Sequence, residues 1–416
     1  MKIAIIGSGI SGLTAAYLLH KNHDIKVFES NDYIGGHTHT HKINLNGRDW
    51  EVDSGFIVYN ENTYPKFIKL LNELNVETQI SSMGFSVKSK KNNLEYAGNS
   101  LNALFAQRAN FFKPSFYKML AQINRFNNEA KVHLEKLDYV TTLKEYLDKN
   151  KYSDEFIHFY VIPMGAAIWS TIPSDMFKMP AKFFIKFFKN HGLLQIKNRP
   201  KWWVIKGGSK QYIKKIISGF KNSIFLSTPV KYVERSENEV KVIFQNDKKE
   251  NQVFDKVIFA THSDQALKLL KNPTELESEI LSTLPYQKNE VLLHLDDSIL
   301  PERKLAWASW NYSMDSDFNS PVALTYNMNI LQSLNCEETF CVTLNNHSLI
   351  NPNKVLKRLT YYHPLFTAKG IESQSKKHQI SGENNTYFCG AYWRNGFHED
   401  GVVSAIDVSK QFGVKF

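Results

Sequence analysis

The sequence predicts an α/β fold made of two interleaved domains, one with a parallel sheet and one with a mixed sheet under a helical cap. Three observations predict this fold. A short apolar run of strand type at residues 2–6 leads through a glycine-rich turn into a helical pattern. Residues 61–202 show mostly helical spacing, as at 64–74 and 142–147. Strand signals return later in the chain, at 291–295, 305–311, 322–326 and 340–344.

The N-terminal strand, turn and helix form a nucleotide-binding pattern. Gly7 allows the tight turn after the strand, Gly9 lets the backbone approach a pyrophosphate, and Gly12 lets the helix pack closely on the strand. The helix that follows directs its partly positive N-terminus toward the phosphates. We therefore expect this turn to bind a dinucleotide through Gly7, Gly9, Ile10, Ser11 and Gly12.

A second strand pattern at residues 25–28 ends in an acidic residue. This residue, Glu29, lies 20 positions past Gly9. A carboxylate at this place accepts hydrogen bonds from ribose hydroxyls and disfavours a 2′-phosphate. Glu29 and the adjacent Ser30 are therefore expected at the ribose.

The segment after Glu29 distinguishes between NAD and FAD. It carries a diglycine, Gly35-Gly36, six residues past the acid. FAD enzymes of the glutathione-reductase-like class use such a diglycine near the pyrophosphate and flavin, whereas simple NAD dehydrogenases normally continue into a helix. The sequence therefore predicts FAD, with Gly35, Gly36, His37 and Thr38 among the residues that bind it.

A hairpin is expected next. Residues 43–45 and 48–52 flank Asn46-Gly47, which favours a type I′ turn. The hairpin leads to Asp53-Ser54-Gly55-Phe56, and a D-x-G at this point recurs in the same flavoprotein class, where its backbone lines the isoalloxazine. Gly55 and Phe56 are therefore added to the predicted FAD site.

Beyond the N-terminus, the motifs occur in the order of the flavin-containing amine oxidase superfamily, which the sequence resembles. Lys206-Gly207-Gly208-Ser209 is similar to the mid-chain glycine segment of that family. The resemblance implies that Val230 pairs its backbone with adenine, and that the strand ending at Ala260-Thr261 returns to the nucleotide domain. It also implies a C-terminal flavin motif in which a helix N-terminus faces the flavin, with Gly390, Asp400, Gly401 and Val402.

A narrower resemblance concerns three segments: 164–170, 307–312 and 396–401. They resemble a bacterial subgroup of predicted NAD/FAD-binding proteins linked to modified fatty-acid synthesis. A similar domain is fused to cyclopropane-fatty-acid synthases in plants. This resemblance implies an acyl-chain or phospholipid substrate.

The chain departs from the amine oxidases at several positions. Tyr33 and His37 stand where that family usually carries arginines. Phe397 stands where a tyrosine commonly forms one wall of an amine-binding cage, so the apolar wall remains and the hydroxyl is lost. Cys389 lacks the sequence setting that tethers flavin covalently in some relatives. We therefore expect non-covalent FAD.

The resemblance implies that the FAD-binding Rossmann-like domain, of glutathione-reductase and amine-oxidase type, comprises residues 1–60, 203–262 and 386–416. Residues 61–202 and 263–385 would form the substrate domain with its mixed sheet and helical cap. Within the cap, the aromatic helix at 183–189 has two interpretations: a buried element over the substrate cavity, or a surface that dips into a membrane interface. Residues 104–105 and 111–114 could form a second such patch.

Two candidate catalytic residues lie in the C-terminal motif. His398 has an ordinary pKa suited to proton transfer, and Glu399 is a carboxylate beside it. Packing of His398, and stabilisation of the first helical turn by Glu399, are the alternatives. The candidate substrate-pocket residues are Tyr59, Trp310, Tyr312 and Phe397.

Composition narrows the classes of partner. The chain has 416 residues, a formal charge of +10 and three cysteines, Cys336, Cys341 and Cys389, with no CxxC pair. The sequence therefore predicts no metal site and a reducing, cytoplasmic location. The basic charge fits solvated lysines or peripheral contact with the inner face of a membrane, and no pattern indicates nucleic-acid binding.

We therefore expect an FAD-dependent oxidoreductase that transfers a hydride or electrons between flavin N5 and an apolar substrate. An unsaturated fatty-acyl chain or phospholipid is the expected substrate, and the reaction is desaturation, oxidation or isomerisation. Two alternatives remain. One is a true amine oxidase that releases peroxide. The other is a flavin-bearing accessory protein that partners a lipid-modifying methyltransferase.

Overall fold

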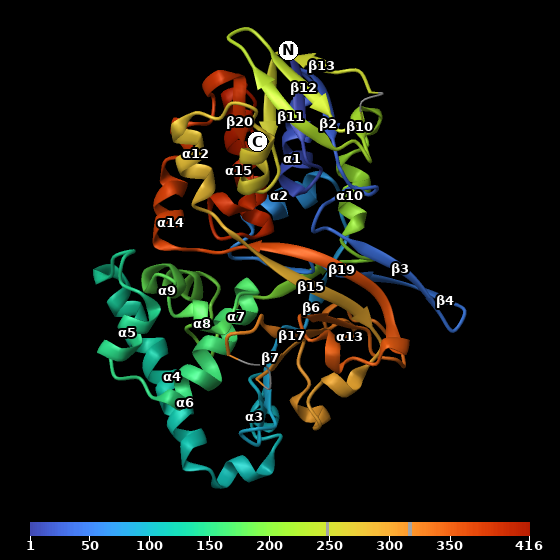
Figure 1. The fold of residues 1–416 in the computed structure, drawn as a ribbon. Coiled ribbons are helices and arrows are strands. Elements are labelled where there is room, and N and C mark those ends of the chain that lie inside the picture. The colour runs from blue at the N-terminus through green and yellow to red at the C-terminus, as the bar shows by residue number, and fades with distance from the viewer. Residues whose placement is uncertain (247–248, 315–317) are drawn as a thin grey trace.

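The computed structural model describes residues 1–246, 249–314 and 318–416. The chain folds into two lobes, and both termini lie on the same lobe (Figure 1). That lobe is built on a parallel sheet, which confirms the predicted α/β class. Its strands are paired in the order β10 (Ile224–Phe225), β2 (Asp24–Phe28), β1 (Lys2–Ile6), β14 (Lys256–Phe259) and β20 (Thr386–Phe388).

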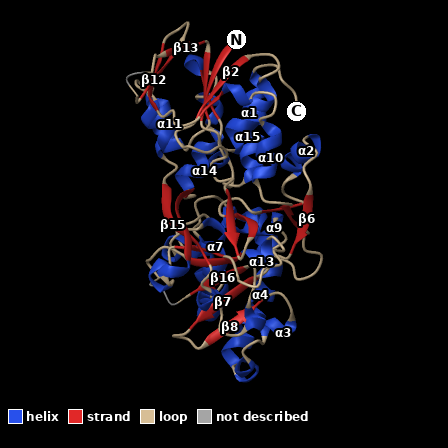
Figure 2. Cartoon of the chain, turned by 90° about the vertical axis from the view of Figure 1, so that its right-hand side faces the viewer, coloured by secondary structure: helices blue, strands red, loops and turns tan. Residues whose placement is uncertain are grey.

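Both faces of the parallel sheet are apolar, as expected for a sheet that is covered on both sides. Successive side chains of each strand point to opposite faces. Ile3 and Ile5 pack into one core, and Ala4 and Ile6 into another. The first core includes residues of α1 (Ile10–Leu19), α2 (Pro65–Glu73), α10 (Lys210–Ile216) and α15 (His398–Gln411). The second includes the antiparallel strands β11 (Val230–Arg235), β12 (Val240–Phe244) and β13 (Gln252–Phe254), with α11 (Ser263–Leu269) and α12 (Glu275–Ser282). Figure 2 shows α1 and α15 on one side of this lobe and β12 and α11 on the other.

The second lobe contains the predicted mixed sheet. Its strand order is β19 (Val355–Pro364), β15 (Tyr286–His294), β18 (Cys341–Leu344), β17 (Ala323–Asn327), β16 (Trp310–Ser313), β7 (Phe85–Ser89) and β8 (Leu94–Ala97). A smaller sheet pairs β5 (Val58–Asn60), β9 (Trp202–Ile205) and β6 (Thr78–Ser81). Short helices α3 (Leu101–Leu104) and α13 (Met328–Leu331) flank the strands.

The helical cap lies between residues 114 and 190. It comprises α4 (Pro114–His133), α5 (Leu143–Lys149), α6 (Asp154–Phe156), α7 (Ile162–Trp169), α8 (Pro173–Met176) and α9 (Ala181–Asn190). Phe184, Ile185 and Phe188 of α9 are fully buried in the core of this cap, and Phe187 is 4% exposed. Of the two interpretations of the aromatic helix, burial over the cavity is therefore the one that the structure supports.

Two details differ from the sequence expectations. The packing places α2, α11 and α12 against the parallel-sheet lobe, and α14 (Ala368–Ser375) lies against α12, although the expected boundaries assign these helices to the substrate domain. The strand expected at 305–311 begins only at Trp310, because Lys304–Ala306 forms a 3₁₀ turn. There the Trp307 indole N–H donates to the Pro301 carbonyl, and the Ala308 N–H donates to the Asn311 side chain, so local bonds replace the strand ladder.

The predicted hairpin is present as β3 (Thr40–Leu45) and β4 (Arg48–Asp53). Both turn residues have positive φ, 52° at Asn46 and 76° at Gly47, as a type I′ turn requires.

Candidate functional site

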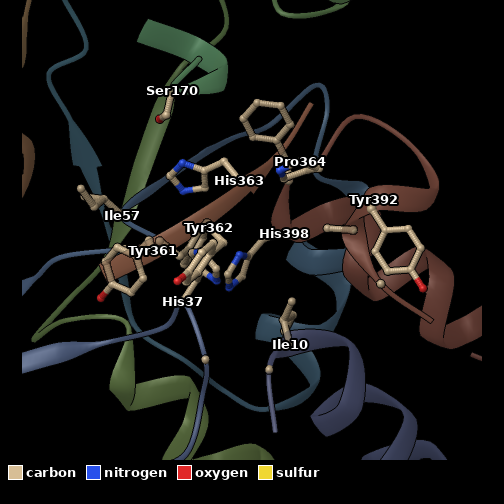
Figure 3. Close-up of a pocket in the computed structure, with 18 of the residues that line it drawn as sticks. Ile10, His37, Ile57, Ser170, Tyr361, Tyr362, His363, Pro364, Tyr392 and His398 are labelled. Carbon is tan, nitrogen blue, oxygen red and sulfur yellow. The ribbon is translucent and has the colours of Figure 1, made fainter. Parts of the chain in front are cut away.

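A cavity of about 1050 Å³ runs between the two lobes. One part, which we call the nucleotide arm, is lined by the β1–α1 turn, the ends of β2 and β14, the diglycine and the start of β11. The other part, the substrate arm, is lined by α7, α9, residues 192–202 and the strands β15, β16, β17 and β19. The motifs of the N-terminal half thus converge on one cavity, which Figure 3 shows at the junction of the two arms.

The glycine turn leaves space for a ligand in the nucleotide arm. A Cβ atom added at Gly9 would meet no protein atom within 4 Å, whereas one at Gly12 would lie 2.0 Å from the Gly7 carbonyl oxygen. Gly7, Gly9, Ile10 and Ser11 line the cavity, and Gly12 does not. Gly12 therefore provides close packing, and Gly9 provides open space in front of the N-terminus of α1.

Glu29 is fixed at the floor of the nucleotide arm. Its Oε2 accepts hydrogen bonds from the Ser8 backbone N–H (2.9 Å) and hydroxyl (2.7 Å). Its Oε1 accepts one from the Asn31 N–H at 2.9 Å. The carboxylate is thus held beside the turn, where a ribose would lie. Ser30 lines the same arm.

The remaining predicted cofactor residues divide into two groups. Gly35, Gly36, His37, Gly55, Phe56, Val230, Ala260, Thr261 and Gly390 line the cavity. Thr38, Asp400, Gly401 and Val402 are buried behind it and do not contribute to its wall. They position the wall instead: the Asp400 carboxylate accepts the Phe397 N–H at 2.9 Å at the start of α15, and Gly401 packs against Ile10 and Ser11.

His398 lies on the wall, next to His37 (Figure 3). Its ring stacks on Phe56, with 3.6 Å between ring centroids, and its Nε2 lies 2.9 Å from the Thr38 hydroxyl and 3.1 Å from the Tyr212 hydroxyl. Burial, with a smaller effect of His37, lowers the pKa of His398 well below its ordinary value. The imidazole is therefore neutral at pH 7, and its Nε2 is engaged by hydroxyl groups.

Glu399 faces away from the cavity, and this corrects the catalytic expectation for it. Its carboxylate accepts the backbone N–H groups of Lys66, at 3.1 Å, and of Phe67, at 2.8 Å. These are two of the free N–H groups in the first turn of α2, so Glu399 caps that helix. Both carboxylate oxygens are used in this contact.

The predicted substrate-pocket residues are also divided. Trp310 and Phe397 line the cavity. Tyr59 packs against Tyr64 and Phe67 in the core of the parallel-sheet lobe, and Tyr312 is buried in the core of the cap. Tyr59 points to the opposite face of β5 from its neighbour Val58, which lines the cavity. Tyr312 shares a face of β16 with Trp310, but it is packed in the core of the cap and does not line the cavity.

Several wall residues were missed by sequence reasoning. Tyr361 and His363 of β19 face the cavity together with His262 and His37. Burial lowers the pKa of His37 and His262 to about 4 and that of His363 to about 3, so all three imidazoles are neutral at pH 7. The i, i+2 spacing of Tyr361 and His363 indicates one shared strand face, but no local signal indicates which cavity that face meets.

The substrate arm is apolar inside and basic at one edge. Phe85, Tyr160, Met164, Ile168, Phe187 and Leu193 line it. Phe187 also stacks on Phe397, with 5.1 Å between ring centroids. Arg199 and Lys201, both exposed, contribute to the wall from the segment that follows α9. Among the described residues that line the whole cavity, Glu29 is the only Asp or Glu, and it belongs to the nucleotide arm.

A family model described as "Flavin containing amine oxidoreductase" matches residues 10–295, which is more than half of the chain. The chain belongs to the flavin-containing amine oxidoreductase family. It is 24% identical over 254 residues to amine oxidase [flavin-containing] A of Canis lupus familiaris, a match that covers 57% of this chain and 45% of that enzyme. Over 96 residues it is 38% identical to 1-hydroxycarotenoid 3,4-desaturase of a Flavobacterium species, covering 23% of this chain and 18% of that enzyme. The matches thus span less than half the length of these two relatives.

Solved structures show the same fold over the whole chain. A putrescine oxidase variant superposes with a TM-score of 0.71 and 14% identity, covering 99% of this chain and 98% of that one. A fatty acid isomerase from P. acnes that produces CLA superposes with a TM-score of 0.68 and 16% identity, with the same coverage. This family likeness confirms the predicted architecture.

FAD is the cofactor of this family, and the cavity fits it. The open space at Gly9, the fixed Glu29 carboxylate and the two helix N-termini of α1 and α15 provide what a dinucleotide and a reduced flavin require. The Cys389 thiol is fully buried and does not line the cavity. Among the described residues, no group of three or more His, Cys, Asp or Glu side chains is placed to hold a metal ion, and no helix is long and apolar enough to cross a membrane.

Proposed function

We propose that this protein is an FAD-dependent oxidoreductase that acts on an apolar acyl substrate, an unsaturated fatty acid or the acyl chain of a phospholipid. The observation that carries the proposal is the character of the substrate arm. Its interior is apolar and aromatic, its edge carries Arg199 and Lys201, and the described wall of this arm holds no carboxylate. An apolar chain would gain free energy by leaving water for this arm, and a carboxylate or phosphate would pair with the two cations.

The same features disfavour an amine as the substrate. A protonated amine entering the arm would approach two cations and find no carboxylate among the described residues of its wall. Phe397 supplies an aromatic face without the hydroxyl that the corresponding tyrosine would have. The solved relatives include both a putrescine oxidase and a fatty acid isomerase, so the fold itself is compatible with either chemistry.

The residues of the junction have defined roles in the proposed reaction. Bound FAD supplies a hydride acceptor whose reduced form is anionic. The N-terminus of α15, just after Phe397, stabilises negative charge at that point of the cavity. Phe187, Phe397 and Trp310 exclude water and hold an apolar chain against the junction. The neutral His398, held by Thr38 and Tyr212, adds no positive charge there.

The test is anaerobic bleaching of the flavin absorbance. Unsaturated fatty acids and phospholipids are compared with mono-, di- and polyamines, and lipid products are analysed because an isomerisation leaves no net reduction. We expect flavin reduction or double-bond migration with a lipid and no response to an amine. Flavin reduction by an amine, with peroxide formed in air, would establish the amine oxidase alternative. A flavin that is inert to every compound, in a protein that binds a lipid methyltransferase, would favour the accessory role.

The role of the basic edge is tested separately with Arg199→Gln/Lys201→Gln. We expect this variant to raise KM for a fatty acid by roughly 1.4- to fivefold per charge removed, because exposed charge pairs contribute about 0.2–1 kcal/mol each. KM for the methyl ester of the same acid should not change. The matched control is Lys197→Gln, an exposed lysine of the same segment that does not line the cavity. Equal effects on acid and ester would show that the two cations do not bind the carboxylate.

A further inference from the structure

The outer end of the second lobe carries exposed apolar side chains. Leu101 is 79% exposed, Phe111 46%, Phe112 88% and Tyr117 46%, and we call these four residues the tip. They lie on α3, on the 3₁₀ turn Arg108–Phe112 and at the start of α4. Both views place α3 at the pole of the molecule opposite to the lobe that holds the termini (Figures 1 and 2). Large apolar side chains gathered at one exposed place mark an interaction surface.

The tip is held by the core beneath it. Phe105 stacks on Phe111 with 4.1 Å between ring centroids and packs edge-on against the buried Phe116 at 5.5 Å. The buried Asn110 side chain donates to the Glu95 carbonyl at 3.1 Å. The structure therefore presents Phe111 and Phe112 outward on a packed support, and their exposure is a property of the folded lobe.

The charges within the segment that carries the tip have one sign. Residues 96–128 contain no Asp or Glu but contain Arg108, Lys113, Lys118 and Arg125. The Arg108 guanidinium donates to the Phe105 carbonyl and the Asn102 amide oxygen, and the Lys113 ammonium donates to the Asn93 carbonyl. These acceptors are neutral, so they do not cancel the two positive charges. Lys118 is paired with Glu155 and Arg125 with Glu129, both farther along the cap, so Arg108 and Lys113 are the cations at the tip itself.

We propose that the tip docks this protein on the surface of an anionic phospholipid bilayer. Phe111 and Phe112 would enter the boundary between headgroups and acyl chains, and Arg108 and Lys113 would contact lipid phosphates. A second copy of the chain fits less well, because a two-fold interface would bring the cations of one tip against those of the other. The proposal rests on the tip alone and does not depend on the proposed reaction.

The experiment is flotation of the full-length, FAD-loaded protein with vesicles. Vesicles of phosphatidylcholine alone are compared with vesicles of phosphatidylcholine mixed with phosphatidylglycerol. We expect binding to the mixed vesicles only, and weaker binding as salt rises, because exposed charges are screened. Phe111→Ser/Phe112→Ser should weaken binding by about tenfold or more, since both rings lose their apolar contact with lipid. Arg108→Gln/Lys113→Gln should also weaken it.

The control variant removes exposed apolar side chains elsewhere. Val253→Ser/Leu349→Ser changes residues that are 47% and 60% exposed outside the tip, and it should bind vesicles like the wild type. Phe112→Ser alone removes the most exposed ring, and it tests the same contact if the double variant does not fold. The proposal is overturned if the wild type binds neither vesicle, or if tip and control variants bind equally. It is also overturned if the tip instead mediates a concentration-dependent dimer that Phe112→Ser abolishes.

Discussion

Two glycines of the same turn show how much a single Cβ atom can matter. At Gly12 the added atom would lie 2.0 Å from the Gly7 carbonyl oxygen, so a side chain there would destabilise the folded protein itself. At Gly9 it would meet no protein atom within 4 Å, and φ there is −69°, which any residue tolerates. A side chain at Gly9 would therefore interfere with the binding of a ligand in the open space and not with folding.

The paired substitutions Gly9→Ala and Gly12→Ala test this separation. We expect Gly9→Ala to leave the melting temperature of the apoprotein nearly unchanged and to weaken FAD binding about tenfold or more, because the methyl group occupies the place of the pyrophosphate. Gly12→Ala should lower the stability of the apoprotein by about 1–3 kcal/mol through overpacking. Calorimetry of the apoprotein and titration with FAD measure the two effects. Wild-type FAD affinity in Gly9→Ala would contradict the assignment of the nucleotide arm.

At the level of the element, the start of α15 gives three adjacent residues three different functions. His398 faces the cavity, Glu399 caps α2, and Asp400 caps its own helix. Successive side chains of a helix point about 100° apart, so neighbours in sequence reach different parts of the fold. The motif itself could be predicted from sequence, but the partners of each side chain could not, because α2 is more than 300 residues away.

Glu399→Gln tests the capping role. Its amide keeps one acceptor oxygen but loses the charge that interacts with the N-terminus of α2, so we expect a loss of about 1–2 kcal/mol in stability. FAD affinity and the KM of any substrate should stay at the wild-type values. Thermal unfolding and steady-state kinetics of the loaded enzyme provide the two measurements, and Glu77→Gln, at an exposed residue, is the control. A variant of full stability that has lost turnover would restore the catalytic interpretation.

At the level of the whole molecule, the features that could be predicted from sequence are those set by residues close together in the chain. The glycine turn, the diglycine and the Asn46-Gly47 hairpin depend on backbone conformation, so the parallel-sheet lobe and its cofactor could be inferred from sequence. The substrate arm depends on pairings between distant strands, such as β15 with β19, and on where α9 and the segment after it lie. The sequence alone therefore could not place four residues in the cavity wall: Arg199, Lys201, Tyr361 and His363.

The interleaved fold also buries many imidazoles, and this predicts how stability depends on pH. Burial lowers the pKa of six histidines to about 4 or, for His363, about 3: His37, His41, His191, His262, His294 and His363. Burial raises the pKa of Asp53 and Asp400 to about 6. Between pH 6.5 and 4 the unfolded chain protonates its histidines while the folded chain does not, so acid favours unfolding. Asp53 and Asp400 have the opposite effect on stability over the same pH range, because the folded chain protonates them before the unfolded chain does. The effect of the six histidines is expected to exceed that of the two aspartates.

We therefore expect the melting temperature to fall steadily as the pH is lowered from about 7 to about 4.5. His294 illustrates the cause. Its Nδ1 accepts the Asp296 N–H at 3.1 Å, and its Nε2 lies 2.7 Å from the Thr343 hydroxyl, so protonation of Nδ1 would break a buried hydrogen bond. His294→Gln should reduce the slope of melting temperature against pH, whereas His378→Gln, at an exposed histidine, should not. Differential scanning fluorimetry across this range measures both slopes. A stability that is flat or rises toward acid would mean that these buried imidazoles are protonated in the folded protein, and the neutral imidazoles inferred for the cavity wall would then be wrong.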